Sequence, residues 1–513
     1  MLRLTSLVLD TMVLFGKRLA EARIWLRLNM ETLQRTANRG SVSTGYDIDN
    51  SCKFEPDNSE SMSRTPSGNG NLKTCTLSFW VKITELNKSH MFFTGDYGGA
   101  ANPWFVIGLI SDRIYISSTA GVSGASVVPS RLLRDTSAWY HLVFAFDTTQ
   151  GTAADRIKIY VNGVQETVFT STTYPSQNDD LDIMAAKAQG IAGYNDGTDY
   201  RFAGYMSEFV GIDGQALAPT EFGEFDEDSG IWKPIDVSGL TFGTNGFYLD
   251  FKDSANLGND ASGGTDFTET NIAAADQAVD TPTNNFAMLS SAMHDVNELS
   301  YSTISEGGTL FRVTTASKWV TAVSSIGVTK GKWYAEFVVS GARPNNWWGI
   351  ASMEQLNNNS GYSSAGSHLG ESGKNWSIGY YQSNGKLDKQ QNSGYTTTAS
   401  WGAAVSQNQV VGVALDMDNH KLYMAVNNTY QASGNPVTAA NPITFDATET
   451  VAIATTGYSL GGGNDTITVA NFGGYKSGGM YSQATDGNGY GGFRYAPPTG
   501  YYALCTKNLA EYG

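Results

Sequence analysis

At 513 residues the chain is too long to fold around a single hydrophobic core, so its length predicts two or three domains. Only 16% of the residues are charged and 12% are aromatic, which excludes a solvated, disordered chain. The net charge of −16 argues against a nucleic-acid-binding surface, because neutralising phosphates requires clustered Lys and Arg. With 57 glycines in addition, the composition is typical of a secreted-type or virion-type β protein.

Residues 1–40 differ from everything after them, because their apolar residues recur at roughly helical spacing and their Lys and Arg make the segment basic. The apolar run at residues 7–15 is short, contains Asp10 and precedes no convincing cleavage site, so it does not match a secretory signal. It is also far shorter than the about 20 residues of a membrane span. The segment predicts an amphipathic helix that docks on a partner or oligomerises. A helix in the membrane plane and an extension of little function are the alternatives.

The three cysteines are too few for a disulfide framework, and their spacing matches no zinc pattern. Cys75 and Cys505 lie in strand patterns, which favours buried free thiols, while a Cys52–Cys75 bridge stays open. The five histidines occur singly, so they form no zinc-binding pair. His141 alternates inside a strand pattern and is interpreted as a satisfied strand residue.

From residue 41 to 255 the sequence consists of short strands separated by clusters of Gly, Asn, Asp and Ser. Residues 139–146 and 157–161 are predicted strands, and Asn162-Gly163 supplies the positive φ angles that a two-residue hairpin turn needs. The strand predicted at residues 76–82 alternates in the same way, with Leu77, Phe79 and Val81 on one face. This region is expected to form one antiparallel β-sandwich.

Four segments of this region, in their order and spacing, resemble laminin-G-like, concanavalin-type lectin and glucanase sandwiches. They are Leu77-Ser-Phe-Trp-Val, Trp139-Tyr-His-Leu-Val, Ile159-Tyr-Val-Asn-Gly163 and Phe202-Ala-Gly-Tyr-Met-Ser-Glu-Phe. The resemblance implies a two-sheet jelly roll whose rim loops bind sugars, often beside a calcium ion.

The loop after residue 95 contains the candidate binding residues of this domain. Sugar-binding rims stack apolar sugar faces on Trp or Tyr rings, and Tyr97 and Trp104 flank a Gly-Ala-Ala-Asn stretch here. Asp96 follows a strand directly, in the rim region where the resembled family coordinates calcium, and a carboxylate is a suitable calcium ligand. We expect Tyr97 and Trp104 to bind ligand and Asp96 to bind calcium, the one cofactor that the sequence suggests.

Residues 256–300 are rich in Gly, Asn, Asp, Thr and Ala, and they predict a linker that runs over the surface. Just before them, the sequence of residues 243–253 resembles segments of structural proteins of marine bacteriophages. The sequence of residues 486–507 shows the same resemblance. In those proteins a laminin-G-like module often precedes a second sandwich.

A second β domain is predicted from residue 301 to 513. Its anchors resemble the SPRY (B30.2-like) sandwich, which implies a binding module without catalytic residues; they are Lys332-Trp-Tyr-Ala-Glu-Phe, Val411-Gly-Val-Ala-Leu-Asp and Val469-Ala-Asn-Phe-Gly. Because neighbouring residues of a strand point to opposite faces, Trp347 and Trp348 cannot both enter the core. Trp347 is therefore the candidate ligand-binding residue of this domain.

Catalytic residues are not expected. Glycoside hydrolysis requires two carboxylates across a cleft. The acidic string at residues 221–228 lacks the final Glu at the required spacing and is interpreted as a solvated loop, and Glu208 has no carboxylate two positions away. Both arguments place a hydrolase last among the functions considered.

The sequence thus predicts an all-β protein of two antiparallel, jelly-roll-like sandwiches behind a short N-terminal amphipathic helix. The expected function is that of a non-enzymatic structural protein on the surface of a phage particle, such as a tail fibre, appendage or decoration subunit. Its partners would be host-surface glycans or other virion proteins, with no nucleic acid and no transmembrane segment, and homo-oligomerisation stays open. An extracellular carbohydrate-binding protein, secreted or on a bacterial surface, is the alternative.

Overall fold

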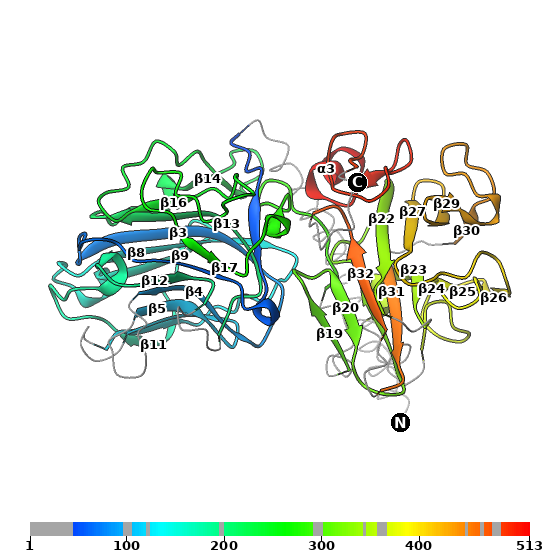
Figure 1. The fold of residues 1–513 in the computed structure, drawn as a ribbon, viewed down its shortest axis with the longest axis horizontal. Helices are drawn as coiled ribbons and strands as arrows, with labels where there is room; N and C mark the ends of the chain where they lie inside the picture. The colour runs from blue at the N-terminus through cyan, green and yellow to red at the C-terminus, as the bar shows by residue number, and fades with distance from the viewer. Residues whose placement is uncertain are drawn as a thin grey trace, which may run out of the picture.

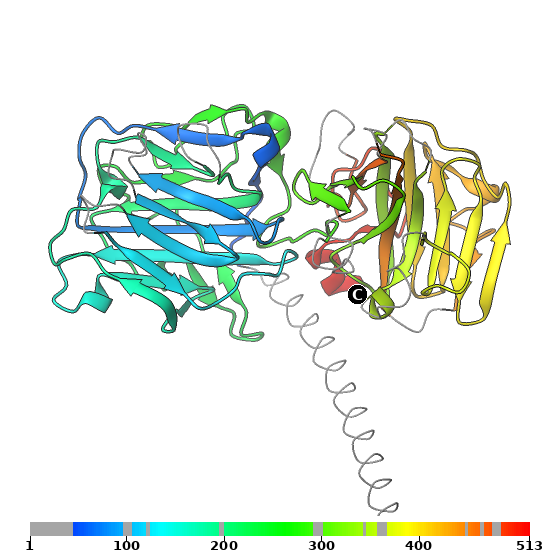
Figure 2. The ribbon, with the colours of Figure 1, turned by 90° about the horizontal axis from the view of Figure 1, so that it is seen from below.

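The structure is a computed structural model of the whole chain. It describes residues 45–95, 105–118, 124–193, 200–290, 301–341, 345–356, 367–446, 450–461, 466–474 and 484–513. These residues form two β-sandwiches that lie side by side (Figures 1 and 2), as the all-β prediction requires. The helix predicted over residues 1–40 lies outside the described residues. In the described part, no helix has the length and apolar character needed to cross a membrane.

The first sandwich contains two eight-stranded sheets. The strands of sheet 1 are β1 (Ser51–Phe54), β3 (Thr74–Ile83), β8 (Trp139–Asp147), β9 (Ile157–Val161), β10 (Val164–Gln165), β13 (Gly204–Asp213), β16 (Phe247–Leu249) and β18 (Gln277–Ala278). The strands of sheet 2 are β2 (Ser61–Arg64), β4 (Ser89–Gly95), β5 (Phe105–Ile110), β6 (Arg113–Ser118), β7 (Ser126–Pro129), β11 (Phe169–Thr173), β12 (Gln189–Ile191) and β17 (Thr268–Thr270). Sheet 1 has the order β10-β9-β8-β3-β13-β1-β18 with β16 beside β13, and sheet 2 has the order β11-β7-β6-β5-β4-β12-β2-β17.

The alternation predicted in β3 sorts its side chains as expected. Leu77, Phe79 and Val81 enter the core between the two sheets, whereas Trp80 belongs to a separate cluster on the outer face of sheet 1. The predicted hairpin turn is also confirmed, because Asn162 and Gly163 have φ angles of 49° and 76°. All three cysteines are buried free thiols, so the alternative Cys52–Cys75 bridge is wrong.

The outer face of sheet 1 is covered by a small hairpin of β14 (Gly223–Phe225) and β15 (Trp232–Pro234) and by the chain that follows it. Trp232 of β15 packs with Trp80 and Trp139 of sheet 1. Farther along the same face, Val237 packs with Val210. This cover turns a sheet face that would meet water into a second, smaller core.

The second sandwich consists of sheets 3 and 4. The strands of sheet 3 are β19 (Ser302–Ser305), β20 (Leu310–Val313), β22 (Lys332–Val339), β27 (Val410–Asp416), β28 (Lys421–Val426), β29 (Thr429–Tyr430), β30 (Ile443–Thr444), β32 (Ile467–Asn471) and β33 (Tyr502–Ala503). Those of sheet 4 are β21 (Lys318–Val323), β23 (Trp347–Ser352), β24 (Ser377–Tyr381), β25 (Leu387–Gln391), β26 (Gly394–Thr398) and β31 (Val451–Ser459). Two short α-helices, α2 (Met353–Leu356) and α3 (Thr506–Tyr512), and several one-turn 3₁₀ helices also occur in the described part.

The structure differs from the expected linker over residues 256–300. Residues 256–278 belong to the first sandwich, since β17 pairs with β2 and β18 pairs with β1. Leu257 and Phe267 are each 1% exposed and enter its core. Asp260 fixes this polar segment against the first sandwich, because its carboxylate accepts hydrogen bonds from the Tyr248 and Ser262 amides and forms an ion pair with Arg64. The other domain limits at residues 41, 301 and 513 stay predictions.

The two sandwiches are joined by buried charged contacts. Lys82 Nζ on β3 lies 2.6 Å from Asp280 Oδ2 and donates to the Phe286 carbonyl at 2.9 Å. At a second place, Lys53 Nζ on β1 lies 2.9 Å from Oε2 of Glu306, a residue in the β19–β20 turn. In the same turn, the Gly307 carbonyl accepts the Tyr205 hydroxyl at 2.7 Å. The turn of one sandwich is thereby seated against the other.

Candidate functional site

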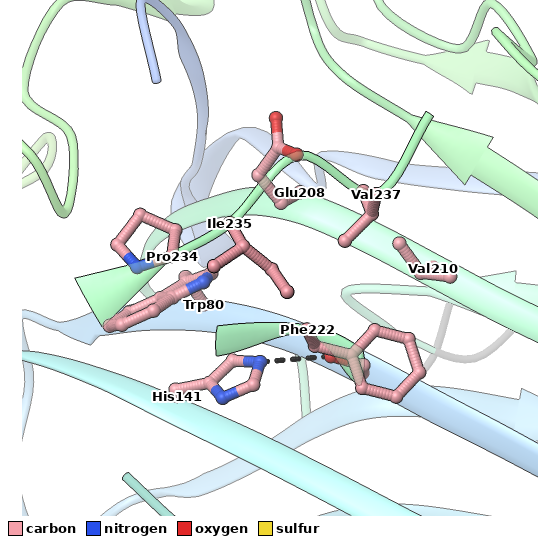
Figure 3. A pocket seen from close by; sticks show the side chains of 9 residues that line it. Trp80, His141, Glu208, Val210, Phe222, Pro234, Ile235 and Val237 are labelled. Atoms are coloured by element: carbon pink, nitrogen blue, oxygen red, sulfur yellow. Dashed lines mark hydrogen bonds between the residues drawn. The ribbon is translucent and has the colours of Figure 1, made fainter. Parts of the chain in front are cut away.

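A hollow lies between the outer face of sheet 1 and its cover (Figure 3). It is lined by Ser78, Trp80, His141, Glu208, Val210, Phe222, Pro234, Ile235 and Val237. The space between these side chains has no room for a water molecule. The hollow therefore holds titratable groups but admits no substrate in this conformation.

His141 on β8 has both ring nitrogens occupied. Its Nδ1 accepts the Trp232 indole N–H at 2.9 Å, so its Nε2 carries the proton and donates to Ser78 Oγ at 2.9 Å (Figure 3). Burial lowers the pKa of His141 to about 3, which keeps the ring neutral. The interpretation of His141 as a satisfied strand residue is confirmed. Its two neighbours make it a structural link between sheet 1 and the cover.

Glu208 is held at an irregularity of β13, where the register against β3 shifts and its own φ is 49°. Its Oε2 accepts the Tyr248 hydroxyl at 2.6 Å and the Tyr46 hydroxyl at 3.3 Å. The residue is 6% exposed, and burial raises the pKa of its carboxyl to about 7. Glu208 is also the only acid among the residues that line this hollow. Glycoside hydrolysis requires two carboxylates across a cleft, and no second one among the described residues lines this hollow, although Asp250 lies close enough to raise the pKa of Glu208.

The raised pKa of Glu208 predicts a pH-dependent stability. A carboxyl whose folded pKa is about 7 binds its proton more tightly in the folded than in the unfolded state, so stability falls as pH rises from about 4.5 to about 7. In Glu208→Gln, which retains an acceptor for Tyr248, we expect the decrease in the free energy of unfolding over this pH range to be smaller by up to about 3 kcal/mol. Urea unfolding at pH 5 and pH 8 measures the effect.

Glu224→Gln is the matched control, because the Glu224 side chain is 57% exposed beside Lys233. It is expected to follow the wild type at both pH values, since exposed ion pairs contribute little. Equal pH profiles for Glu208→Gln and the wild type would contradict the assignment of the titration to Glu208.

The sequence predicts a solvated loop for the acidic string at residues 221–228, but this string contains strand β14 and a buried Phe222, and only its end at residues 226–228 enters the turn toward β15. Asp226 accepts the Ser229 amide and hydroxyl, which lowers its pKa to about 2, and Lys233 lies 3.2 Å away. These contacts hold the end of the β14–β15 hairpin together. They give the Asp226 carboxylate a structural role in this hairpin.

The predicted rim residues Asp96, Tyr97 and Trp104 follow β4 and precede β5 in the sequence, outside the described residues. Their assignment to calcium and ligand stays a prediction. Within the ranges that the structure describes, no three His, Cys, Asp or Glu side chains converge as a metal site requires.

Trp347 lies on the outer face of sheet 4. The predicted alternation is confirmed, because Trp348 enters the inner core while Trp347 joins an outer cluster. Trp347 is only 2% exposed, however, and its ring stacks on His368 at 4.0 Å and on Tyr381 at 4.5 Å between centroids. Its indole N–H is buried without an acceptor among the described residues. A ligand could reach Trp347 only after one of the two stacked rings moves.

The grouping around Glu208 was not predictable from the sequence. Tyr46 and Tyr248 are separated by 202 positions, and their hydroxyls lie 3.3 Å apart. The only local signal was Glu208 itself, a carboxylate in a strand whose neighbours Ser207 and Phe209 are fully buried.

Comparison with known proteins supports the lectin-like character of the first sandwich. Residues 57–221 match the sequence profile of the family described as the concanavalin A-like lectin/glucanases superfamily. A comparison with curated proteins finds no match.

Several solved structures are similar in fold. The SPRY domain of human HERC1 is 13% identical, covers 33% of this chain and 91% of its own, and has a TM-score of 0.24. The laminin alpha1 chain of mouse, domains LG4-5, is 10% identical, covers 83% of this chain and 90% of its own, and has a TM-score of 0.28. A candidate carbohydrate-binding protein of Bacteroides ovatus is 17% identical, covers 44% of this chain and 59% of its own, and has a TM-score of 0.31.

Proposed function

We propose that the chain is a non-enzymatic structural protein of a phage particle, displayed on the virion surface, whose sandwiches bind host glycans or neighbouring virion proteins. The observation that carries the binding part is the lectin-type sandwich at residues 57–221. The phage assignment rests on the resemblance of the sequences of residues 243–253 and 486–507 to structural proteins of marine bacteriophages. Both assignments describe a protein that acts by binding other molecules.

Two features of the first sandwich favour binding over catalysis. Its hollow has no room for water, and its single carboxylate is tied by two tyrosine hydroxyls. An acid catalyst must reach the glycosidic oxygen, whereas the carboxyl of Glu208 is covered.

The junction of the two sandwiches favours a structural role. Lys53 and Lys82 are each at most 1% exposed and lie between groups from both sandwiches or the chain that joins them. Buried ion pairs of this kind hold one geometry, because separating the partners leaves charges without compensation. A fixed angle between two binding heads suits a subunit that must keep its place on a particle.

Glycan binding is tested with the full-length chain on a glycan array, once with calcium and once with a chelator. We expect calcium-dependent binding to a defined glycan, abolished in Trp104→Ala and in Asp96→Ala. Phe225→Ala is the control, because Phe225 is an aromatic residue that is 50% exposed outside the predicted rim. Equal losses in all three variants would contradict a site at Asp96 and Trp104.

The particle assignment is tested separately. We expect mass spectrometry to find the chain in purified phage particles at a fixed ratio to the capsid protein. Glycan binding by a chain that is absent from particles would instead favour a secreted or surface-bound bacterial protein. An absence of glycan binding with the chain present in particles would leave protein contacts as its role.

A further inference from the structure

Strand β26 is the exposed edge of sheet 4, and all five of its residues are exposed. Figure 1 shows β26 at the outer end of the second sandwich, far from the junction. Its sequence, Gly-Tyr-Thr-Thr-Thr, contains no charge and no proline and is rich in residues that favour strands. A strand edge offers unpaired backbone N–H and C=O groups, and natural proteins usually protect such edges.

The other sheet ends in the described part carry such protection. β10, β18 and β29 have two residues each, β17 has three and β19 has four. β11 has five residues, yet its pairing with β7 is interrupted by a bulge between Phe169 and Ser171. β21 begins at a lysine and is mostly buried. Among these edges, β26 alone is long, regular, uncharged and exposed on both faces.

The pairing of β25 with β24 and β26 determines which backbone groups of β26 are free. The Tyr381 amide donates to the Lys386 carbonyl, so residues 386, 388 and 390 direct their backbone groups toward β24. Residues 387, 389 and 391 then bond to their partners on β26, which are Thr398, Thr396 and Gly394. The backbone N–H and C=O groups of Tyr395 and Thr397 therefore point away from the sheet.

We propose that β26 is a dimerisation edge, which pairs antiparallel with β26 of a second copy of this chain. In this register Tyr395 of each copy exchanges backbone hydrogen bonds with Thr397 of the other, and the two-fold axis passes between the two Thr396 residues. The strand is self-complementary because its outward groups are spaced symmetrically about Thr396. Closed two-fold dimers are also the commonest oligomers.

Local charges do not oppose this pairing. Asp388, the partner of Thr397 on β25, lies 2.6 Å from Lys386 Nζ, and Lys389 donates to the Thr444 carbonyl. β26 itself carries no charge, so the edge brings none of its own toward the second copy. This interface is independent of glycan binding.

The first test is a proline substitution that spares the sheet itself. Thr397→Pro removes an N–H that faces away from β25, so the ladder to β25 is retained. We expect the wild type and Thr397→Val to form a dimer in sedimentation analysis. In Thr397→Pro, the dissociation constant of the dimer should rise by roughly tenfold or more. Circular dichroism confirms that the variants are folded. A wild type that stays monomeric, or a dimer unaffected by Thr397→Pro, would overturn the proposal.

A cross-linking experiment tests the register. The two Thr396 residues would form a pair without hydrogen bonds, whose Cα atoms lie about 4.5 Å apart, within reach of a disulfide. We expect Thr396→Cys to give a covalent dimer under mild oxidation, since the three natural cysteines are buried. Thr398→Cys is the control, because its two copies would be displaced by four residues, or about 13 Å. Equal cross-linking of both variants would contradict this register.

Discussion

Replacing Lys82 by methionine is expected to destabilise the protein by about 3–5 kcal/mol, the usual cost of leaving a buried charge without its partner. The Lys82 ammonium is inaccessible to solvent and lies 2.6 Å from Asp280 Oδ2, and the second oxygen of Asp280 accepts the Trp139 indole N–H at 2.9 Å. Methionine fills much of the lysine volume, so the loss measures charge and hydrogen bonding more than packing. Chemical denaturation followed by tryptophan fluorescence determines the difference.

The double variant Lys82→Met, Asp280→Asn supplies the control for this prediction. It removes both charges and retains an amide oxygen that can accept from Trp139, so it should be more stable than Lys82→Met alone. A loss below about 1 kcal/mol in Lys82→Met would show that water or a neighbouring group compensates Asp280.

The second large effect is expected at the Lys53 cluster, which consists of Lys53, Glu55, Glu60, Asp276 and Glu306. Lys53 Nζ lies 3.2 Å from Glu60, 3.0 Å from Asp276 and 2.9 Å from Glu306. Glu55 joins the cluster by accepting the Glu306 amide at 2.5 Å. One ammonium therefore pairs with three carboxyl groups and lies near a fourth, and its removal in Lys53→Met is expected to cost about 3–5 kcal/mol at pH 8.

The cost should be smaller at pH 5. Burial raises the pKa of Glu55 and of Glu60 to about 7, and the neighbouring Glu306 raises that of Glu55 further. Both carboxyls bind protons more tightly in the folded state, so this part of the stability is present at low pH and falls between about pH 4.5 and 7. At pH 5 they are largely protonated, and the variant then leaves fewer negative charges unpaired.

Calorimetry at the two pH values, with Lys73→Met as the control, tests this prediction. The Lys73 side chain is 42% exposed and lies 3.8 Å from Asp180, so its loss should cost less than about 1 kcal/mol. Because the cluster joins both sandwiches, we expect Lys53→Met to separate their unfolding into two transitions. An equal loss at pH 5 and pH 8 would contradict the role of Glu55 and Glu60.

Local sequence patterns account for much of the fold. The alternation in β3 separates Leu77, Phe79 and Val81 from Trp80, because successive strand residues point to opposite faces. Likewise, the Asn162-Gly163 pair predicts its turn from backbone preference alone. The residues that would bind ligand are less accessible to such reasoning. Alternation places Trp347 outside the inner core, but it cannot predict that His368 and Tyr381 stack on the ring.

The sequence by itself thus determined the all-β class, the inner faces of the main strands and the tight turn, since each depends on neighbours a few positions away. Only the tertiary structure decided which polar groups meet. Lys53 meets Glu306 across 253 positions and Lys82 meets Asp280 across 198, while residues 256–278 complete two sheets instead of crossing between domains. Those contacts depend on how distant strands are brought together, and a buried charge is tolerated only where the fold has placed its partner.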